Sequence, residues 1–461
     1  MGHLRQAYLG ASPHQTLCIT PYSHRRPFVP TGECFLRRLP DELLCRILEY
    51  LVPRLYMFDF DYGPCLPIPL VCRRWERLFS SILYRNINLG SSCANTNRRQ
   101  IKEFDATLRQ RPDLGDAVRR VEVSFHPTSD ATCEMLAYIL SCCKGLRELL
   151  LEITWTQSAW IVLNAAKRAS LETLELRRGP SFQMILKHFS LPTLKELSLA
   201  YYGLGNGEKP GAQKYPSSDT AHEDLKLLIS SAPPCNVTTI VLERPSAPAH
   251  VTRSFLQWPA RLTSLTMRCI INSACDADYT VDNVQRILDD HHYTLQHISL
   301  GILAHGIRSL PDFSSFMSLE WLQIHGHNLF GASSCSTASK LKAPQLRSLG
   351  ISFNTEDQHQ TSPQEFGPDK IGWLEGFFDH MTPGANKLKT VFVEFEPEAR
   401  LSDAEQTNND TWSWSYIDQA VGIFAAHNVA MTYTQPHIPR KEWDQAVENR
   451  KQKAAMRAFV A

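Results

Sequence analysis

A six-residue pattern of apolar residues recurs from residue 118 onward and limits what this chain can fold into. It has the form L-x-x-L-x-L, with Val, Ile or Met at some of the leucine positions. Successive copies begin 28, 25, 23, 43, 25, 33, 24, 27 and 42 residues apart. The copies are Val118–Val123, Leu146–Leu151, Leu171–Leu176, Leu194–Leu199, Val237–Leu242, Leu262–Met267, Leu295–Leu300, Leu319–Ile324, Leu346–Ile351 and Leu388–Val393. Each has the length and alternation of a strand with one buried face, so the pattern predicts a chain of short strands.

The segments between these strands have apolar residues at helical spacing. They predict helices within 129–145, 158–170, 181–189, 222–233, 280–292 and 413–428, and a last strand at 429–433. Strand and helix therefore alternate, which indicates an α/β fold with a parallel sheet. The strands of a doubly wound sheet are covered on both faces and are apolar throughout. Here every second strand residue is polar, so one face of the sheet is expected to be open to solvent.

A repeat of this length with this alternation resembles the leucine-rich repeat. The resemblance implies a solenoid: a curved parallel sheet with helices outside and an open concave face. The ninth position of that repeat is often Asn or Cys, and here only Asn354 fits. We therefore expect an irregular solenoid without a regular asparagine ladder. Loops at 203–221, 328–343, 354–370 and 396–411 account for the longest spacings.

Side chains on the open face are the candidates for binding another protein. Alternation places them at the polar positions of each strand. Arg120, Glu122, Glu148, Glu152 and Glu175 are expected there. Aromatic residues and arginine commonly anchor protein interfaces. The candidate client-binding residues are Arg177, Arg268, His297, Trp321, Gln323, His325, Phe392 and Glu394.

Two helices are predicted before the repeats. In LRRLPDELLCRILEYLVP, Pro40 marks the start of a helix, Asp41 and Glu42 favour its first turn, and Pro53 follows its end. A second helix is expected in PLVCRRWERLFSSILYRNINL, which then becomes extended. Each helix has one broad apolar stripe that requires a partner.

Together, LPxELLxxILxxL, LVCRRW and LYRxIxL resemble an F-box, over about residues 36–90. The resemblance implies a small helical module that binds a Skp-type adaptor and, through it, a cullin of a ubiquitin ligase. A module of this size has too little interior to bury all these apolar side chains. The implied adaptor-binding residues are Leu39, Pro40, Leu43, Leu44, Ile47, Leu48, Leu70, Val71, Cys72 and Trp75.

The fold class is thus α/β: a small helical F-box followed by an irregular leucine-rich-repeat solenoid. The predicted parts are a disordered arm at 1–34, the F-box at 35–90, the solenoid at 91–436 and a basic helix or cap at 437–461. The connection at 53–66 is longer and more aromatic than usual for an F-box. We expect its aromatic residues to pack locally.

Composition argues against several other classes. The 48 Lys and Arg residues balance 47 Asp and Glu, so we expect no nucleic-acid partner. No apolar stretch is long enough to span a membrane. The 13 cysteines form no CxxC pair, which predicts neither a disulfide framework nor a zinc site and favours a cytoplasmic or nuclear location. No catalytic motif, cofactor or metal is expected, and His291, His292, His297, His325 and His327 have no accompanying ligands.

Two functional hypotheses remain. In the first, the chain is a non-catalytic receptor that holds a client protein near a ubiquitin-conjugating enzyme. In the second, it is an interaction scaffold that uses the F-box without ubiquitin transfer. A hidden hydrolytic site is a third, minor alternative. Arg177, Arg178 and Arg268 are weak evidence for recognition of a phosphorylated client, since surface arginines usually pair with neighbouring carboxylates.

Overall fold

The structure is a computed structural model that divides into two compact units, Met1–Phe79 and Ser80–Ala461. It describes residues 39–51, 72–90, 94–125, 130–153, 159–167, 170–177, 181–188, 191–201, 218–232, 235–245, 247–268, 278–303, 309–353, 366–381, 387–395, 412, 414–435 and 439–460. Several features of the sequence analysis lie outside these residues: the predicted arm at 1–34, the insert at 53–66, Asn354, Arg178 and the predicted loop at 396–411.

The first unit contains helix α1, Asp41–Leu51, and the start of helix α2, Arg73–Leu83. Pro40 precedes α1, and its carbonyl accepts the Leu44 amide at 3.1 Å. Asp41 and Glu42 lie in the first turn, where a negative charge interacts favourably with the helix dipole. Leu44 and Leu48, one turn apart, are buried.

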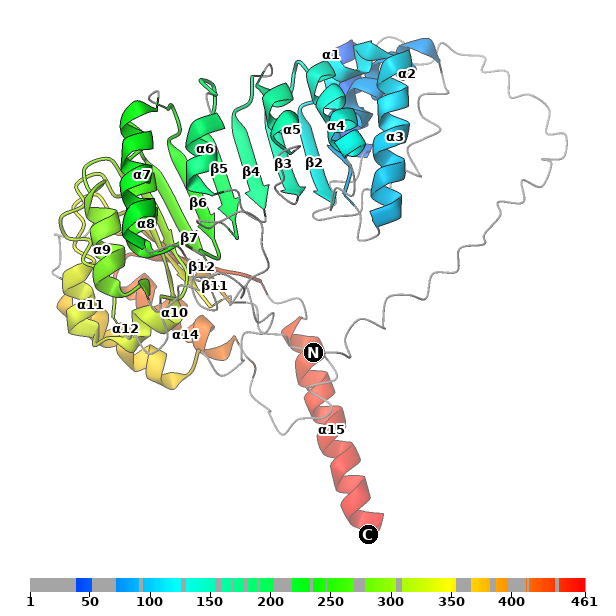
Figure 1. Ribbon diagram of the computed structural model, residues 1–461. Helices are drawn as coiled ribbons and strands as arrows, with labels where there is room; N and C mark the ends of the chain where they lie inside the picture. The colour runs from blue at the N-terminus through cyan, green and yellow to red at the C-terminus, as the bar shows by residue number, and fades with distance from the viewer. Residues whose placement is uncertain are drawn as a thin grey trace, which may run out of the picture. The chain divides into compact units, whose positions relative to one another are not determined.

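The second unit is built on one twelve-stranded parallel sheet whose strands follow chain order without a crossover. Figure 1 shows this sheet curving, with the helices along its outer side. The strands are β1 Asn86–Asn88, β2 Arg120–Phe125, β3 Glu148–Ile153, β4 Thr173–Arg177, β5 Glu196–Ala200, β6 Thr239–Glu243, β7 Ser264–Arg268, β8 His297–Leu300, β9 Trp321–His325, β10 Ser348–Ser352, β11 Thr390–Glu394 and β12 Ala430–Tyr433. The prediction of a leucine-rich-repeat-like solenoid is confirmed.

Helices lie between most successive strands of this unit, as predicted, and among the described residues only β8 and β9 follow each other without one. They are α3 Ala94–Gln110, the 3-10 helix η4 Pro112–Ala117, α4 Asp130–Cys142, α5 Ala159–Ala166, α6 Phe182–His188, α7 Ser218–Ser231, α8 Ala249–Leu256, α9 Val281–Asp289, α10 Gly326–Gly331, α11 Ser334–Lys340, α12 Pro368–His380, α14 Ser415–Ala426 and α15 Arg440–Val460. The first turns of α15 pack through Trp443, which is buried and lies 5.8 Å from Trp412 between ring centroids.

The strand register produces two apolar columns that run through the solenoid. The second and fourth residues of β2 to β11 are all apolar and at most 3% exposed. In β4 these are Leu174 and Leu176, which pair with Leu197 and Leu199 of β5. Burial of each such side chain contributes about 1.5–3 kcal/mol. A shift of one residue in the pairing would move every buried side chain of a strand to the solvent-facing side of the sheet. The two apolar columns therefore fix the register.

Neighbouring repeats are joined by backbone hydrogen bonds just before each strand. The Arg119 carbonyl accepts the amides of Arg147 at 2.8 Å and Glu148 at 3.0 Å. The Arg147 carbonyl then accepts the amides of Glu172 and Thr173, and the arrangement recurs as far as β11. One carbonyl thus satisfies two amides of the next repeat, which closes the repeats without an asparagine side chain.

The predicted loop at 328–343 is wrong, because that segment contains the end of α10 and all of α11. Its four Ser residues and its small side chains give no helical periodicity, but local capping compensates. Ser333 caps α11 by accepting the Ser336 amide at 3.3 Å. Similarly, α7 begins at Ser218 and α12 at Pro368, inside the predicted loops 203–221 and 354–370.

Candidate functional site

Helix α1 is attached to α2 by one carboxylate. Asp41 accepts hydrogen bonds from Arg74, at 2.8 Å to Nε, and from Arg77, at 2.9 Å. Arg74 also donates to the Leu39 carbonyl at 2.5 Å, just before α1. The hydrogen bond from Arg74 is the main cause that lowers the pKa of Asp41, and Arg77 adds to it. The first turn of α1 is therefore held against the first turn of α2.

The predicted adaptor-binding residues differ in their exposure to solvent. Leu43 is 48% exposed and Ile47 is 42% exposed, and they lie four residues apart on one side of α1. Pro40 and Cys72 are exposed, while Leu39 and Trp75 are half-buried. Leu44 and Leu48 are buried, so the structure places them away from the surface. Leu70 and Val71 lie outside the described residues.

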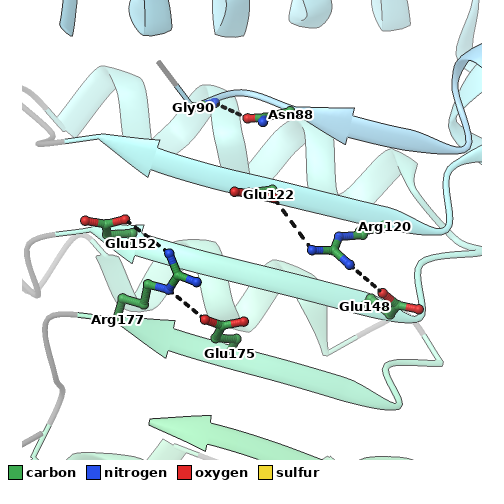
Figure 2. Close-up of polar contacts among 8 residues, drawn as sticks. All are labelled: Asn88, Gly90, Arg120, Glu122, Glu148, Glu152, Glu175 and Arg177. Atoms are coloured by element: carbon green, nitrogen blue, oxygen red, sulfur yellow. Dashed lines mark hydrogen bonds and ion pairs between the residues drawn. The ribbon is translucent and has the colours of Figure 1, made fainter. Parts of the chain in front are cut away.

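The second candidate surface is the open face of the sheet, formed by the first, third and fifth residues of the strands. In its N-terminal part, arginines are surrounded by glutamates (Figure 2). Arg120 lies 3.7 Å from Glu122 and 3.3 Å from Glu148 on the neighbouring strand. Each contact is at least partly exposed, so its effect on stability is small.

Arg177 forms the next pair of contacts along this face. It lies 2.6 Å from Glu175 and 3.8 Å from Glu152, as Figure 2 also shows. Burial acts to lower the pKa of Arg177, but the negative charges of Glu175, Glu152 and Glu243 and the hydrogen bond to Glu175 outweigh it, and the pKa is raised. Arg177 is therefore already engaged by its own chain, which is the outcome expected for a surface arginine and argues against its use as a phosphate-binding group.

The C-terminal part of the open face has aromatic and amide side chains. Phe392 is 43% exposed, and Trp321 is half-buried with its ring centroid 6.4 Å from that of His297. Gln323 donates to Glu394 at 3.0 Å and accepts from the Ser299 hydroxyl at 3.1 Å. These two bonds fix the Gln323 amide in place.

His325 lies in the same register but is only 4% exposed. Its Nδ1 accepts the His327 amide at 3.1 Å and caps helix α10. Burial lowers its pKa to about 3, so the ring is neutral at ordinary pH. The prediction of an accessible client-binding histidine at this position does not fit its burial. Arg268, in contrast, is exposed at the end of β7.

Two further glutamates belong to the open face and were not among the candidates. Glu196 is the first residue of β5 and Glu243 the last of β6. The alternation of the repeat already places both on this face. The charge environment of each glutamate depends on the residues beside it in the neighbouring strands. The spacing of the motif alone does not identify those neighbours.

The described residues provide little for other chemistry. Within them, no group of three or more His, Cys, Asp or Glu residues is arranged to hold a metal ion. Among the described helices, none combines the length and apolar character needed to cross a membrane. A solvent-accessible recess of about 400 Å³ lies beside the turn after α9 and is lined by polar residues that include Asp290 and His291.

Comparison with known proteins identifies the N-terminal module. Residues 36–90 match the family described as F-box-like. The chain therefore consists of an F-box-like domain followed by a twelve-stranded parallel sheet with alternating helices, consistent with leucine-rich repeats. No curated protein matches the chain.

Proposed function

We propose that this protein is the client-recognition subunit of a Skp–cullin–F-box ubiquitin ligase. The observation that carries the proposal is the match of residues 36–90 to the F-box-like family in a chain that continues as a solenoid with an open face. The F-box-like domain binds a Skp-type adaptor, and the open face binds a protein client. The chain performs no bond chemistry itself, but holds the client near a conjugating enzyme carried by other subunits and so raises its effective concentration.

The exposed side of α1 supports the adaptor contact. Leu43 and Ile47 expose almost half of their apolar surface on a helix that Asp41 and Arg74 hold in place. Exposed large apolar side chains at this spacing suit a partner helix or groove. The buried Leu44 and Leu48 support the contact indirectly, because they pack an adjacent face of the helix, about 100° away, into the interior.

The test is binding of the purified full chain to a Skp-type adaptor. Replacement of both Leu43 and Ile47 by Asp is expected to weaken binding at least about 100-fold, since each removes an apolar contact and adds a charge that must be desolvated. Arg46→Ala, on the same helix and also exposed, is the matched control. Exposed positions are preferable to Leu44 and Leu48, whose replacement would disturb the core.

Two measurements test the proposal: adaptor binding tests the docking surface, and the half-life of a client separates a receptor from a scaffold. If the double variant binds the adaptor as tightly as wild type, the proposed docking surface is wrong. If wild type binds the adaptor and removal of the protein from cells extends the half-life of a client, the chain acts as a receptor. Unchanged half-lives of bound clients would instead identify a scaffold that does not direct ubiquitin transfer.

A further inference from the structure

The open face is electrically asymmetric along the solenoid. From β2 to β6 its positions contain six glutamates and two arginines: Glu122, Glu148, Glu152, Glu175, Glu196, Glu243, Arg120 and Arg177. Arg268 follows on β7. From β8 to β11 the same positions contain one carboxylate, that of Glu394, and no Lys or Arg.

The two arginines do not neutralise the N-terminal part. Each contacts more than one carboxylate: Arg120 lies near Glu122 and Glu148, and Arg177 lies near Glu152 and Glu175 and also interacts electrostatically with Glu243. Glu196 has no hydrogen bond or ion pair to its carboxylate within the described residues. Its pKa is raised, first by burial and then by the negative charges of Glu148 and Glu175. Among the described residues, no cation pairs with this carboxylate to stabilise its charged form.

The C-terminal part of the same face exposes apolar surface instead. Phe392 is 43% exposed in the third position of β11, and Trp321 is partly exposed in the first position of β9. On the intervening strand β10, the residue paired with Phe392 is Gly350, which has no side chain to cover that ring, and the residue paired with Trp321 is the small Ser348. Trp321 and Phe392 lie two strands apart on the same sheet face, and exposed aromatic side chains on such a face are typical of an apolar contact site.

We propose that the open face binds an extended segment of a partner protein in which a cluster of Lys or Arg residues precedes or follows a cluster of aromatic or aliphatic residues. This inference rests on the proposed function and specifies the class of client. The cationic cluster lies over Glu196 and its neighbours on β3 to β6. The apolar cluster lies over Trp321 and Phe392. Complementary charge selects the partner and sets its direction along the sheet.

The strand count gives the spacing of the two clusters. Glu196 and Trp321 are both first residues of their strands and are four strands apart, on β5 and β9. At about 4.8 Å between neighbouring strands, they are separated by about 19 Å along the sheet. An extended chain covers this distance in about six residues. A client segment therefore needs about six residues between its basic and apolar clusters.

The experiment measures fluorescence anisotropy of a labelled peptide added to the full chain. The probe has a run of lysines, a spacer of about six Gly and Ser residues, and the sequence Trp-Leu-Phe. A second probe has the same clusters without the spacer. Wild type is expected to bind the first probe about tenfold more tightly than the second, because only the first reaches both sites. Raised salt is expected to weaken binding.

Two variants divide the site and each has a matched control. Glu196→Gln is expected to weaken binding of the spaced probe about fivefold by removing the charge facing the lysines. Phe392→Ser is expected to weaken it by a similar factor. Glu134→Gln and Leu227→Ser, at exposed positions on the outer helices α4 and α7, are expected to leave binding unchanged.

The possible results separate this inference from the proposed function. No binding of the spaced probe by folded wild type, equal binding of both probes, or loss in only one of the two variants would overturn the two-part site. Self-association that Glu196→Gln disrupts would show that a second copy occupies the face, and would overturn it too. Adaptor binding, measured on the same preparation, tests the F-box-like domain alone and is independent of these outcomes.

Discussion

Gln323 on β9 reaches Glu394 on β11 at 3.0 Å, across the intervening strand β10. The contact exists because Gly350 of β10 has no side chain. A Cβ atom at that position would lie 2.9 Å from Cγ of Gln323 and 3.1 Å from its Cβ. The glycine therefore leaves the space through which two non-adjacent repeats are connected.

Gly350→Val is expected to displace Gln323 and break its bond to Glu394, lowering the free energy of unfolding by about 1–2 kcal/mol. Urea unfolding measures the change. In a Gln323→Ala background most of the loss should disappear, because the displaced side chain is gone. Gly372→Ala is the control: it lies inside α12 with no atom near its added Cβ, and alanine should stabilise the helix by about 0.5–1 kcal/mol. Equal losses in both backgrounds would contradict this account.

Glu196→Gln is expected to increase stability slightly at pH 7, by about 0.5 kcal/mol or less. The folded-state pKa of Glu196 is raised, so its ionised form is less favourable in the folded chain than in the unfolded chain. This cost is present above the folded pKa and disappears as pH falls through it toward the unfolded value. The gain from Gln should therefore vanish below about pH 4. Thermal unfolding of both proteins at pH 7 and pH 4 measures it, and a gain that grows on acidification would refute the assignment.

His325 is expected to make the solenoid sensitive to mild acid. Burial lowers its pKa to about 3, below the unfolded value, so protonation favours the unfolded chain. The stability associated with neutral His325 is complete above about pH 6.5 and is lost as pH falls, by about 1–2 kcal/mol at pH 5. His325→Asn keeps an N-cap for α10 but cannot titrate, so its stability should change less between pH 7 and pH 5. A parallel pH profile for the two proteins would show that His325 is not responsible.

Asp41→Asn is expected to loosen the start of α1. The pKa of Asp41 is lowered by Arg74 and Arg77, so its contribution to stability is present above the unfolded value and is lost as pH falls through the folded one. Hydrogen exchange at neutral pH should show faster exchange of the α1 amides in the variant, and adaptor binding should weaken. Asp113→Asn, which removes another exposed Asp–Arg pair, should leave α1 exchange unchanged. Unaltered α1 protection in Asp41→Asn would argue against this role.

The parts of the fold that follow from periodicity could be predicted from the sequence. The buried apolar residues of β4 and β5 can be identified in the sequences LETLEL and LKELSL, because burial of one sheet face requires apolar and polar residues to alternate. Helices α10 and α11 could not be predicted, since their stability comes from caps at His325 and Ser333 and from packing of residues such as Leu329. Among the open-face candidates, exposure of Phe392 agreed with its position in the repeat, whereas His325 was buried by tertiary contacts that alternation does not include.

The strand order from β1 to β12 has a consequence for how the molecule assembles. Every strand pairs only with strands next to it in the chain. Each new strand pairing therefore closes a loop no longer than one repeat, and sheet formation does not require contacts between segments far apart in the sequence. Such a chain can start to fold at any well-paired repeat and add its neighbours one at a time, and it loses them from the ends in the same way. Truncation at a repeat boundary should therefore shorten the sheet gradually rather than abolish it.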